Sequence, residues 1–325
     1  MATKNPGSWA FGISPTGWPN YGVVGVPPFT GNYFYVDPVN GSDGNTGGPS
    51  DPLASLSQAH SNCTAGQNDT VLLLGGSGQV GLTSTLTWSK SQTHLIGLGS
   101  DSQEAPVAQI QSSGSTVFTP LVNVTGTGCI FQNFTAVHGF GSTAAQICWA
   151  EAGGANSYKK VAFKGMNNNI AGGVTGSRSI TVGGLGRNHF DDCTFGGTTV
   201  FRGADNSTLE FTNVTQKNIF RRGLFQAVST TGASVHFSAN SSGSLTSWQL
   251  FDQCAFLNAG PKQSVPNVGS TLSGVAIMSA TAGGLILLNG CVSVGATKWE
   301  ATASNFIFVD NVSANGTGGI SVNNI

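Results

Sequence analysis

The tetrapeptide Phe131-Gln132-Asn133-Phe134 decides the fold class, because variants of it recur through the rest of the chain. Each variant has an apolar residue, any residue, a small polar residue, and then Cys, Val, Phe or Met. The variants are Phe163-Lys164-Gly165-Met166, Phe190-Asp191-Asp192-Cys193, Phe211-Thr212-Asn213-Val214, Phe251-Asp252-Gln253-Cys254, Leu288-Asn289-Gly290-Cys291 and Val309-Asp310-Asn311-Val312. Their last residues lie 32, 27, 21, 40, 37 and 21 positions apart.

Spacings of about 21 to 27 residues are typical of one coil of a parallel β-helix, and longer spacings indicate coils that carry inserted loops. In such a solenoid, equivalent residues stack into ladders, and an Asn at a sharp bend bonds to the coils above and below. We therefore predict an all-β, right-handed, single-stranded parallel β-helix. The residues expected at the bend are Asn133, Asp192, Asn213, Gln253 and Asn311.

The composition agrees with this fold and excludes others. Only 8% of the 325 residues are charged, which excludes coiled coils and charged helical bundles. Like charges stacked about 4.8 Å apart would repel, so a ladder fold favours uncharged polar side chains. The apolar fraction of 39%, with 19 Phe and 6 Trp, is enough for a long core. A net charge of −1 predicts neither a nucleic acid nor a membrane as partner.

The chain divides into two segments. Residues 1–31 are rich in Gly, Pro and aromatic residues and predict an extended arm, whereas residues 32–325 predict the β-helix domain. A free arm with so many aromatic side chains would be insoluble, so we expect it to pack on a neighbouring subunit or on its own body. The arm residues expected to contact a partner are Trp9, Phe11, Trp18, Tyr21 and Phe29.

Local patterns predict one short helix and no disulfides. The helix is expected to open at Ser50-Asp51-Pro52, with Pro at its first position, and to run to Cys63. The six cysteines form no CxxC pair, so we interpret them as buried free thiols. No stretch approaches 18 apolar residues, and the first residues show no hydrophobic signal segment, so we expect synthesis in a cytoplasm.

The stretch Tyr33-Phe34-Tyr35-Val36-Asp37-Pro38, continued by Val39-Asn40-Gly41-Ser42-Asp43-Gly44-Asn45, resembles the opening of right-handed parallel β-helix proteins of the pectate-lyase-like repeat family, as also found in phage virion proteins. The resemblance implies that the Tyr-Val-Asp strand starts the solenoid, that Asn40–Asn45 is a structural turn, and that the following helix caps the apolar end. It covers about residues 33–100 closely. Such domains occur in polysaccharide lyases and hydrolases, adhesins and tailspikes, so the resemblance indicates fold more than function.

The sequence predicts no catalytic set, no cofactor and no metal site. A β-helix lyase or hydrolase needs grouped carboxylates, and the chain has only 14 acidic residues. The best constellation lies between Arg178 and Arg222, where a lyase-type site, contacts to a sugar or a protein partner, and ion pairs between coils or subunits are all open alternatives. The candidate contact residues are Arg187, Asp191, Arg202, Asp205, Arg221 and Arg222. His189 lies two positions before Asp191, which weakly suggests a base.

The first functional hypothesis is a non-enzymatic structural protein of a bacteriophage particle, a homotrimeric capsid decoration or cement protein located in the virion. Its partners would be further copies of itself and the major capsid protein or another virion protein. The alternative is a tailspike or adhesin that binds or cleaves a host cell-surface polysaccharide, as a lyase or glycoside hydrolase if it is an enzyme.

Overall fold

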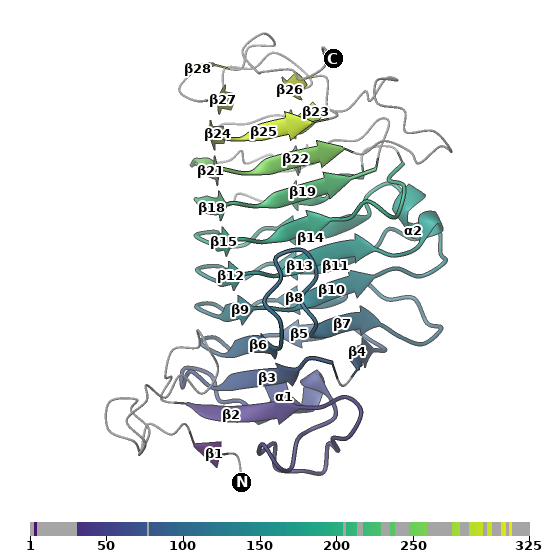
Figure 1. The fold of residues 1–325 in the computed structure, drawn as a ribbon, viewed down its shortest axis with the longest axis vertical. Helices are drawn as coiled ribbons and strands as arrows, with labels where there is room; N and C mark the ends of the chain where they lie inside the picture. The colour runs from purple at the N-terminus through teal and green to yellow at the C-terminus, as the bar shows by residue number, and fades with distance from the viewer. Residues whose placement is uncertain are drawn as a thin grey trace.

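The computed structural model describes residues 3–4, 31–76, 78–203, 206–212, 217–228, 235–237, 247–258, 275–279, 286–294, 298–300, 307–309 and 312–313. Within them the chain winds as a right-handed parallel β-helix whose coils stack along one long axis (Figure 1). The all-β architecture predicted from the repeat is confirmed. Neither described helix is long and apolar enough to cross a lipid bilayer.

Three sheets form the sides of the solenoid. Sheet 1 contains, in spatial order, β1 (Thr3–Lys4), β2 (Asn32–Val36), β3 (Thr70–Leu74), β6 (His94–Leu98), β9 (Ile130–Gln132), β12 (Ser157–Lys159), β15 (His189–Asp191), β18 (Asn218–Arg221), β21 (Gln249–Asp252), β24 (Ile286–Asn289), β27 (Ile307–Val309) and β28 (Val312–Ser313). Sheet 2 contains β4 (Gln79–Leu82), β7 (Gln109–Ser112), β10 (Thr135–His138), β13 (Ala162–Met166), β16 (Thr194–Gly196), β19 (Leu224–Ala227), β22 (Ala255–Asn258) and β25 (Val292–Val294). Sheet 3 contains β5 (Leu86–Trp88), β8 (Val122–Val124), β11 (Ile147–Glu151), β14 (Arg178–Val182), β17 (Leu209–Phe211), β20 (Val235–Phe237), β23 (Val275–Ser279) and β26 (Lys298–Glu300).

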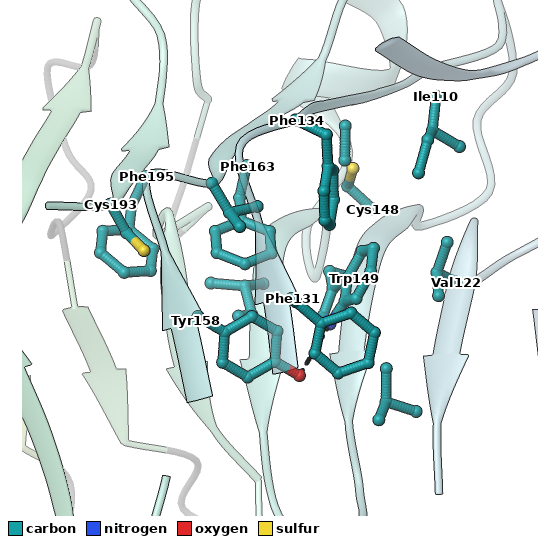
Figure 2. Packing of buried hydrophobic residues seen from close by; sticks show 14 of the residues in the cluster. Ile110, Val122, Phe131, Phe134, Cys148, Trp149, Tyr158, Phe163, Cys193 and Phe195 are labelled. Atoms are coloured by element: carbon teal, nitrogen blue, oxygen red, sulfur yellow. Dashed lines mark hydrogen bonds between the residues drawn. The ribbon is translucent and has the colours of Figure 1, made fainter. Parts of the chain in front are cut away.

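Aromatic side chains fill the interior in register with the strands. Phe190 stacks on Tyr158 and on Phe220 with ring centroids 4.6 Å apart in both cases, close to the spacing of neighbouring strands. On the sheet 2 side, Phe195 stacks on Phe225 at 4.4 Å. Figure 2 shows part of this core, where the ring of Trp149 packs edge-on against Phe131 and Phe163, with centroids 5.3 and 5.5 Å apart. Each coil thus buries large apolar surface against the next, which is the main stabilising contribution to a fold of this kind.

The structure corrects the register of the predicted repeat. Four of the tetrapeptides begin inside a sheet 1 strand and end just after it, at equivalent positions in their coils. They begin at Phe131, Phe190, Phe251 and Leu288. Phe163, however, lies in β13 of sheet 2, and Phe211 lies in β17 of sheet 3. All three sides of a coil bury apolar residues, so a four-residue pattern does not identify its side. Between residues 156 and 249, successive coils are 32, 30 and 31 residues long, longer than the 21–27 expected.

The bend after the sheet 1 strands is one residue with a left-handed backbone. Its amide donates a hydrogen bond to a carbonyl of the next coil, for instance from Asp192 to Arg221 at 3.0 Å. The predicted bend positions Asn133, Asp192 and Gln253 are confirmed, whereas Asn213 and Asn311 lie outside the described residues. We call this set the outer corner. Its members are Asn133, Lys160, Asp192, Arg222, Gln253 and Gly290, with φ between 49° and 60°.

The first coil is closed by helix α1 (Leu56–Asn62), which buries Leu56 and Ala59 at the end of the core. Its N-cap is Ser55, whose hydroxyl accepts from the amide of Gln58 at 3.1 Å. The prediction that Pro52 opens the helix is therefore wrong by one turn, because Ser55 supplies the better cap. A second short helix, α2 (Asn169–Gly173), follows β13. The interpretation of all six cysteines as buried free thiols is confirmed.

The N-terminal segment is described only at its start. Thr3–Lys4 pairs antiparallel with β2 at one edge of sheet 1. The aromatic residues expected to contact a partner, Trp9, Phe11, Trp18, Tyr21 and Phe29, lie outside the described residues. The division of the chain at residue 31 stays a prediction.

Candidate functional site

The loop between β6 and β7 leaves its own coil and lies along the solenoid (Figure 1, dark blue loop rising in front of β8 and β13). We call residues 99–107 the strap. Its backbone contacts several following coils, because Thr135 donates to the carbonyl of Pro106 at 2.9 Å and Thr194 to that of Gln103 at 3.1 Å. The side chain of Gln103 reaches further and donates to the carbonyl of Arg222 at 2.7 Å.

Two acidic side chains of the strap bind lysines of the coil that contains β12 and β13. Asp101 forms an ion pair with Lys160, and Glu104 lies 3.7 Å from the Nζ atom of Lys164. Glu104 also accepts a hydrogen bond of 3.2 Å from Gln226 on β19. These contacts connect residues up to 122 positions apart, so no local pattern indicates them.

A cavity of about 290 Å³ opens on the sheet 2 side of the strap. We call it the Arg202 cavity. Its polar lining comes from the strap, from β13 and β19, and from the loop after β16, and its apolar lining from Val137, Met166 and Val200. A second cavity, of about 420 Å³, lies on the other side of the strap between Ser100 and the outer-corner residue Asn133. The strap therefore separates two hollows on one side of the solenoid.

Arg202 is the most unusual group in the first cavity. Its side chain is 1% exposed, and one guanidinium nitrogen, Nη2, donates to the hydroxyl of Ser179. The other nitrogen, Nη1, has no hydrogen-bond partner among the described residues. Burial, with a smaller contribution from the charge of Arg178, lowers the pKa of Arg202 to about 10. The guanidinium stays protonated at neutral pH, and no carboxylate of the described residues pairs with this buried cation.

Neighbouring residues make room for Arg202 and add polar groups. Gly165 has a φ of +69°, and a Cβ atom there would lie 2.9 Å from Nη2 of Arg202 and closer still to the hydroxyl of Ser179. Gln226 is 6% exposed, and its carbonyl oxygen Oε1 also has no hydrogen-bond partner. Burial lowers the pKa of Lys164, opposed in part by Glu104. The cavity thus combines cationic donors with one unsatisfied acceptor.

The arginines and acidic residues that the sequence predicts as one cluster lie in different parts of the solenoid. Arg222 bridges Asp192, at 2.6 and 3.0 Å, and Asp191, at 3.7 Å, along the outer corner. Arg221 pairs with Asp252 at 3.8 Å in the same region. Arg187 lies at the opposite end of the strands, before β15, with a φ of 61°. Arg202 lines the cavity on sheet 2, and Asp205 lies outside the described residues.

Asp191 and Asp192 do not both lie in a strand, because β15 ends at Asp191. Asp192 is a left-handed bend residue, so both carboxylates reach the guanidinium of Arg222, which holds the pKa of Asp192 below its ordinary value. His189 lies 3.5 Å from Asp191. The cluster is an ion-pair network on the surface.

The acidic residues of the first coil have structural roles. Asp43 accepts hydrogen bonds from the amide and hydroxyl of Ser55, both at 2.8 Å, and so joins the Asn40–Asn45 turn to α1. Asp37 accepts from the amides of Val39 and Asn40 at 3.0 and 3.1 Å. Among the described residues, no group of three or more His, Cys, Asp or Glu side chains could hold a metal ion.

A buried amide ladder, missed in the sequence, runs along the corner that precedes the sheet 1 strands. The side-chain oxygen of Asn156 accepts from the amide of Cys129 at 2.7 Å, and that of Asn188 from the amide of Asn156 at 3.0 Å. Asn218 continues the ladder by accepting from Asn188 and donating to Gln249. The sequence does contain a pattern that could have predicted this ladder. In each of these coils an Asn or Gln stands two positions before the aromatic residue that stacks in the core.

Glu151 is attached to this ladder inside the solenoid. It is 1% exposed and accepts hydrogen bonds from Asn156, at 3.0 Å, and from the hydroxyl of Tyr158. Burial raises the pKa of Glu151 to about 7, against the lowering effect of these hydrogen bonds. Tyr158 also accepts from the indole nitrogen of Trp149 at 3.2 Å, the bond drawn in Figure 2. Glu151 is not one of the residues that line the two cavities.

Comparison with known proteins supports the fold. No protein-family model matches the sequence, and no curated protein matches it. The crystal structure of the pectin methylesterase from Aspergillus niger is similar, with a TM-score of 0.51 and 12% identity over 87% of this chain and 93% of that chain. The pectate lyase Pel9A has a TM-score of 0.46 and 14% identity, over 84% of this chain and 82% of that chain. The similarity to the pectin methylesterase structure supports the β-helix fold alone, because an identity this low does not transfer an activity.

Proposed function

We propose that this protein binds a cell-surface polysaccharide along the side of its solenoid and does not cleave it, as a spike or adhesin of a bacteriophage particle. The observation that carries the proposal is the pair of cavities on the two sides of the strap. Polysaccharides are extended ligands, and two adjacent cavities along one side of the solenoid can hold successive sugar residues.

The engaged carboxylates support binding without cleavage. Glycoside hydrolysis uses two carboxyl groups about 5 to 9.5 Å apart with separate acid and base roles. Of the acidic residues beside the cavities, Asp101 is paired with Lys160, and Glu104 with Lys164 and Gln226. Three of the four histidines with described side chains, His60, His94 and His138, have a pKa lowered to about 4 by burial. None of these three histidines lines either cavity.

The test combines binding with product analysis. The full chain would be applied to an array of bacterial surface polysaccharides, and each bound polysaccharide would then be incubated with the protein and assayed for new reducing ends and unsaturated sugars. We expect retention of at least one polysaccharide without either product. Absence of binding to the host surface, or release of oligosaccharides, would contradict the proposal.

A second candidate, a homotrimeric capsid decoration or cement protein, is favoured by the N-terminal segment. The sequence of residues 5–30 carries five aromatic residues, and the described strands on either side of it, β1 and β2, pair at one edge of sheet 1, which suits a docking segment. Cryo-electron microscopy of purified particles distinguishes the two candidates. Hundreds of copies on the shell support decoration, and a few trimers at the tail support a spike.

A further inference from the structure

We infer that Cys254 and Cys291 form an oxidisable pair, in which a peroxide converts the two thiols to a disulfide that joins and stabilises neighbouring coils near the C-terminal end of the solenoid. Each cysteine directly follows an outer-corner residue, Gln253 or Gly290, and so stands at the same place in its coil. The pair is independent of the polysaccharide binding proposed above, because neither cysteine lines either cavity.

The strands that follow the two cysteines set the distance between their backbones. β22 and β25 are neighbouring parallel strands in which Ala255 is in register with Val292 (Figure 1). The amide of Val292 donates to the carbonyl of Cys254 at 3.0 Å. Neighbouring strands lie about 4.7 to 4.9 Å apart, and a disulfide needs Cα atoms about 4.4 to 6.8 Å apart. The two coils are therefore already at a distance that a disulfide spans.

The two sulfur atoms also lie close together. Sγ of Cys291 donates to the carbonyl of Phe251 at 3.2 Å, and Phe251 belongs to β21, in the coil of Cys254. The thiol of Cys291 is therefore directed toward that coil. The two thiols are hydrogen-bonded to one another, and this bond, together with burial, raises the pKa of Cys254. Only a small movement separates this thiol pair from a covalent bond.

Cys193 shows what the same corner position does without a second thiol. It follows the outer-corner residue Asp192 and is buried, and its Sγ donates to the carbonyl of Asp191 at 3.4 Å. The next coil has Gly223 at the equivalent place, where the backbone repeats the same bond to the following coil. Cys193 is therefore a matched thiol that has no sulfur beside it at this corner.

The reaction needs a two-electron oxidant, and hydrogen peroxide is small and uncharged. Cys291 is 9% exposed against 1% for Cys254, and β25 is the last strand of sheet 2 in the described part of the chain, so peroxide reaches Cys291 first.

The bonds change in two steps. The deprotonated sulfur of Cys291 attacks one peroxide oxygen, the O–O bond breaks, and the released hydroxide takes up the thiol proton, which leaves a sulfenic acid and one water. The sulfur of Cys254 then loses its proton and attacks the sulfur of Cys291. The S–S bond forms, and the sulfenic oxygen leaves as a second water. Two thiols and one peroxide thus give one disulfide and two waters.

A disulfide at this place would hold the C-terminal coils together. The repeats of a solenoid contact only their neighbours, so coils near an end open more easily than those in the middle. The two cysteines are 37 positions apart, and the bond would close that loop in the unfolded chain, which removes many of its conformations. We therefore expect the oxidised protein to be more stable than the reduced protein.

The test uses the full chain with hydrogen peroxide as the oxidant. Reduced protein is treated with peroxide, quenched with catalase, denatured and alkylated with iodoacetamide, and then analysed by intact mass and peptide mapping. We expect a single chain in which four of the six thiols are alkylated, with one linked pair of peptides that contain Cys254 and Cys291. Alkylation of all six thiols would overturn the inference. Oxidation only to sulfinic or sulfonic acid, or a link between any other two cysteines, would overturn it too.

Variants connect the disulfide to stability. Cys254→Ser and Cys291→Ser should each abolish the link, whereas Cys193→Ser, the matched change at the same corner, should keep it. The oxidised wild type should melt at least about 3 °C above the reduced protein, and Cys291→Ser should not show this difference. A link that does not raise the melting temperature would overturn the stabilising role. If a variant does not fold, the peptide map of the wild type still decides which cysteines are linked.

Discussion

The two corners that border sheet 1 each repeat one set of hydrogen bonds over several successive coils, yet they differ in chemistry. The corner before the strands carries the buried ladder of Asn156, Asn188, Asn218 and Gln249, all amides. The outer corner after the strands carries Asn, Lys, Asp, Arg, Gln and Gly at one equivalent position. An amide side chain can both accept and donate hydrogen bonds between coils. Asn and Gln are therefore favoured at this buried corner, where every polar group needs a partner. At the outer corner only the backbone bonds are repeated, and the side chains are free to serve other contacts.

The largest effect should come from breaking the buried ladder at Asn156. Asn156→Ala leaves the amide of Cys129 without its acceptor and removes one of the two side chains that donate to Glu151, while Tyr158 remains. We expect a loss of about 3 kcal/mol in the free energy of unfolding, measured by urea denaturation. The matched change at the outer corner, Asp192→Asn, should cost less than about 1 kcal/mol. Equal losses would remove the distinction between the two corners.

Glu151 should make the buried corner sensitive to pH. Its pKa is about 7 when folded and near 4.5 when unfolded, so between these values the folded chain holds a proton that the unfolded chain has lost. Stability is therefore greatest below about pH 4.5, falls as the pH rises toward 7, and is constant above it, a change on the order of 3 kcal/mol from this group.

The corresponding variant is Glu151→Gln, which removes the ionisation and keeps the shape. Its free energy of unfolding should exceed that of the wild type more at pH 8 than at pH 5, as followed by denaturation at both values. A difference between variant and wild type that does not change with pH would contradict the raised pKa.

At the outer corner, Arg222→Gln should have a small effect. The Arg222 side chain is 50% exposed, so loss of its bonds to Asp192 should cost about 0.2 to 1 kcal/mol and less at high salt. Thermal melts at low and high salt concentration measure this loss. A loss above about 2 kcal/mol would place Arg222 among the buried structural residues instead.

The smallest effect is expected for Lys160→Asn. Lys160 has a φ of 51°, a backbone conformation that Asn adopts more readily, while the exposed ion pair with Asp101 on the strap is lost. The two contributions oppose each other, so the melting temperature should stay within about 2 °C of the wild type. A large decrease would show that the strap depends on this pair.

Part of this architecture was accessible from the sequence. The aromatic and amide positions repeat locally, and Asn133, Asp192 and Gln253 were identified as bend residues. The sequence did not show to which sheet each repeat belongs, because Phe163 and Phe211 fit the same short pattern but lie in sheets 2 and 3. The sequence could not predict the Arg202 cavity, because two of its lining residues, Glu104 and Gln226, are 122 positions apart and are brought together by the path of the strap.

The amino-acid sequence alone determined a stacked solenoid with an aromatic interior and few charges, because every coil must bury the same kind of side chain against its neighbours and the pattern therefore returns along the chain. Only the tertiary structure decided which polar groups meet. The partners of Arg202, Glu151 and Arg222 depend on the path of the strap and on the stacking of coils, and these bring together residues that no local pattern connects.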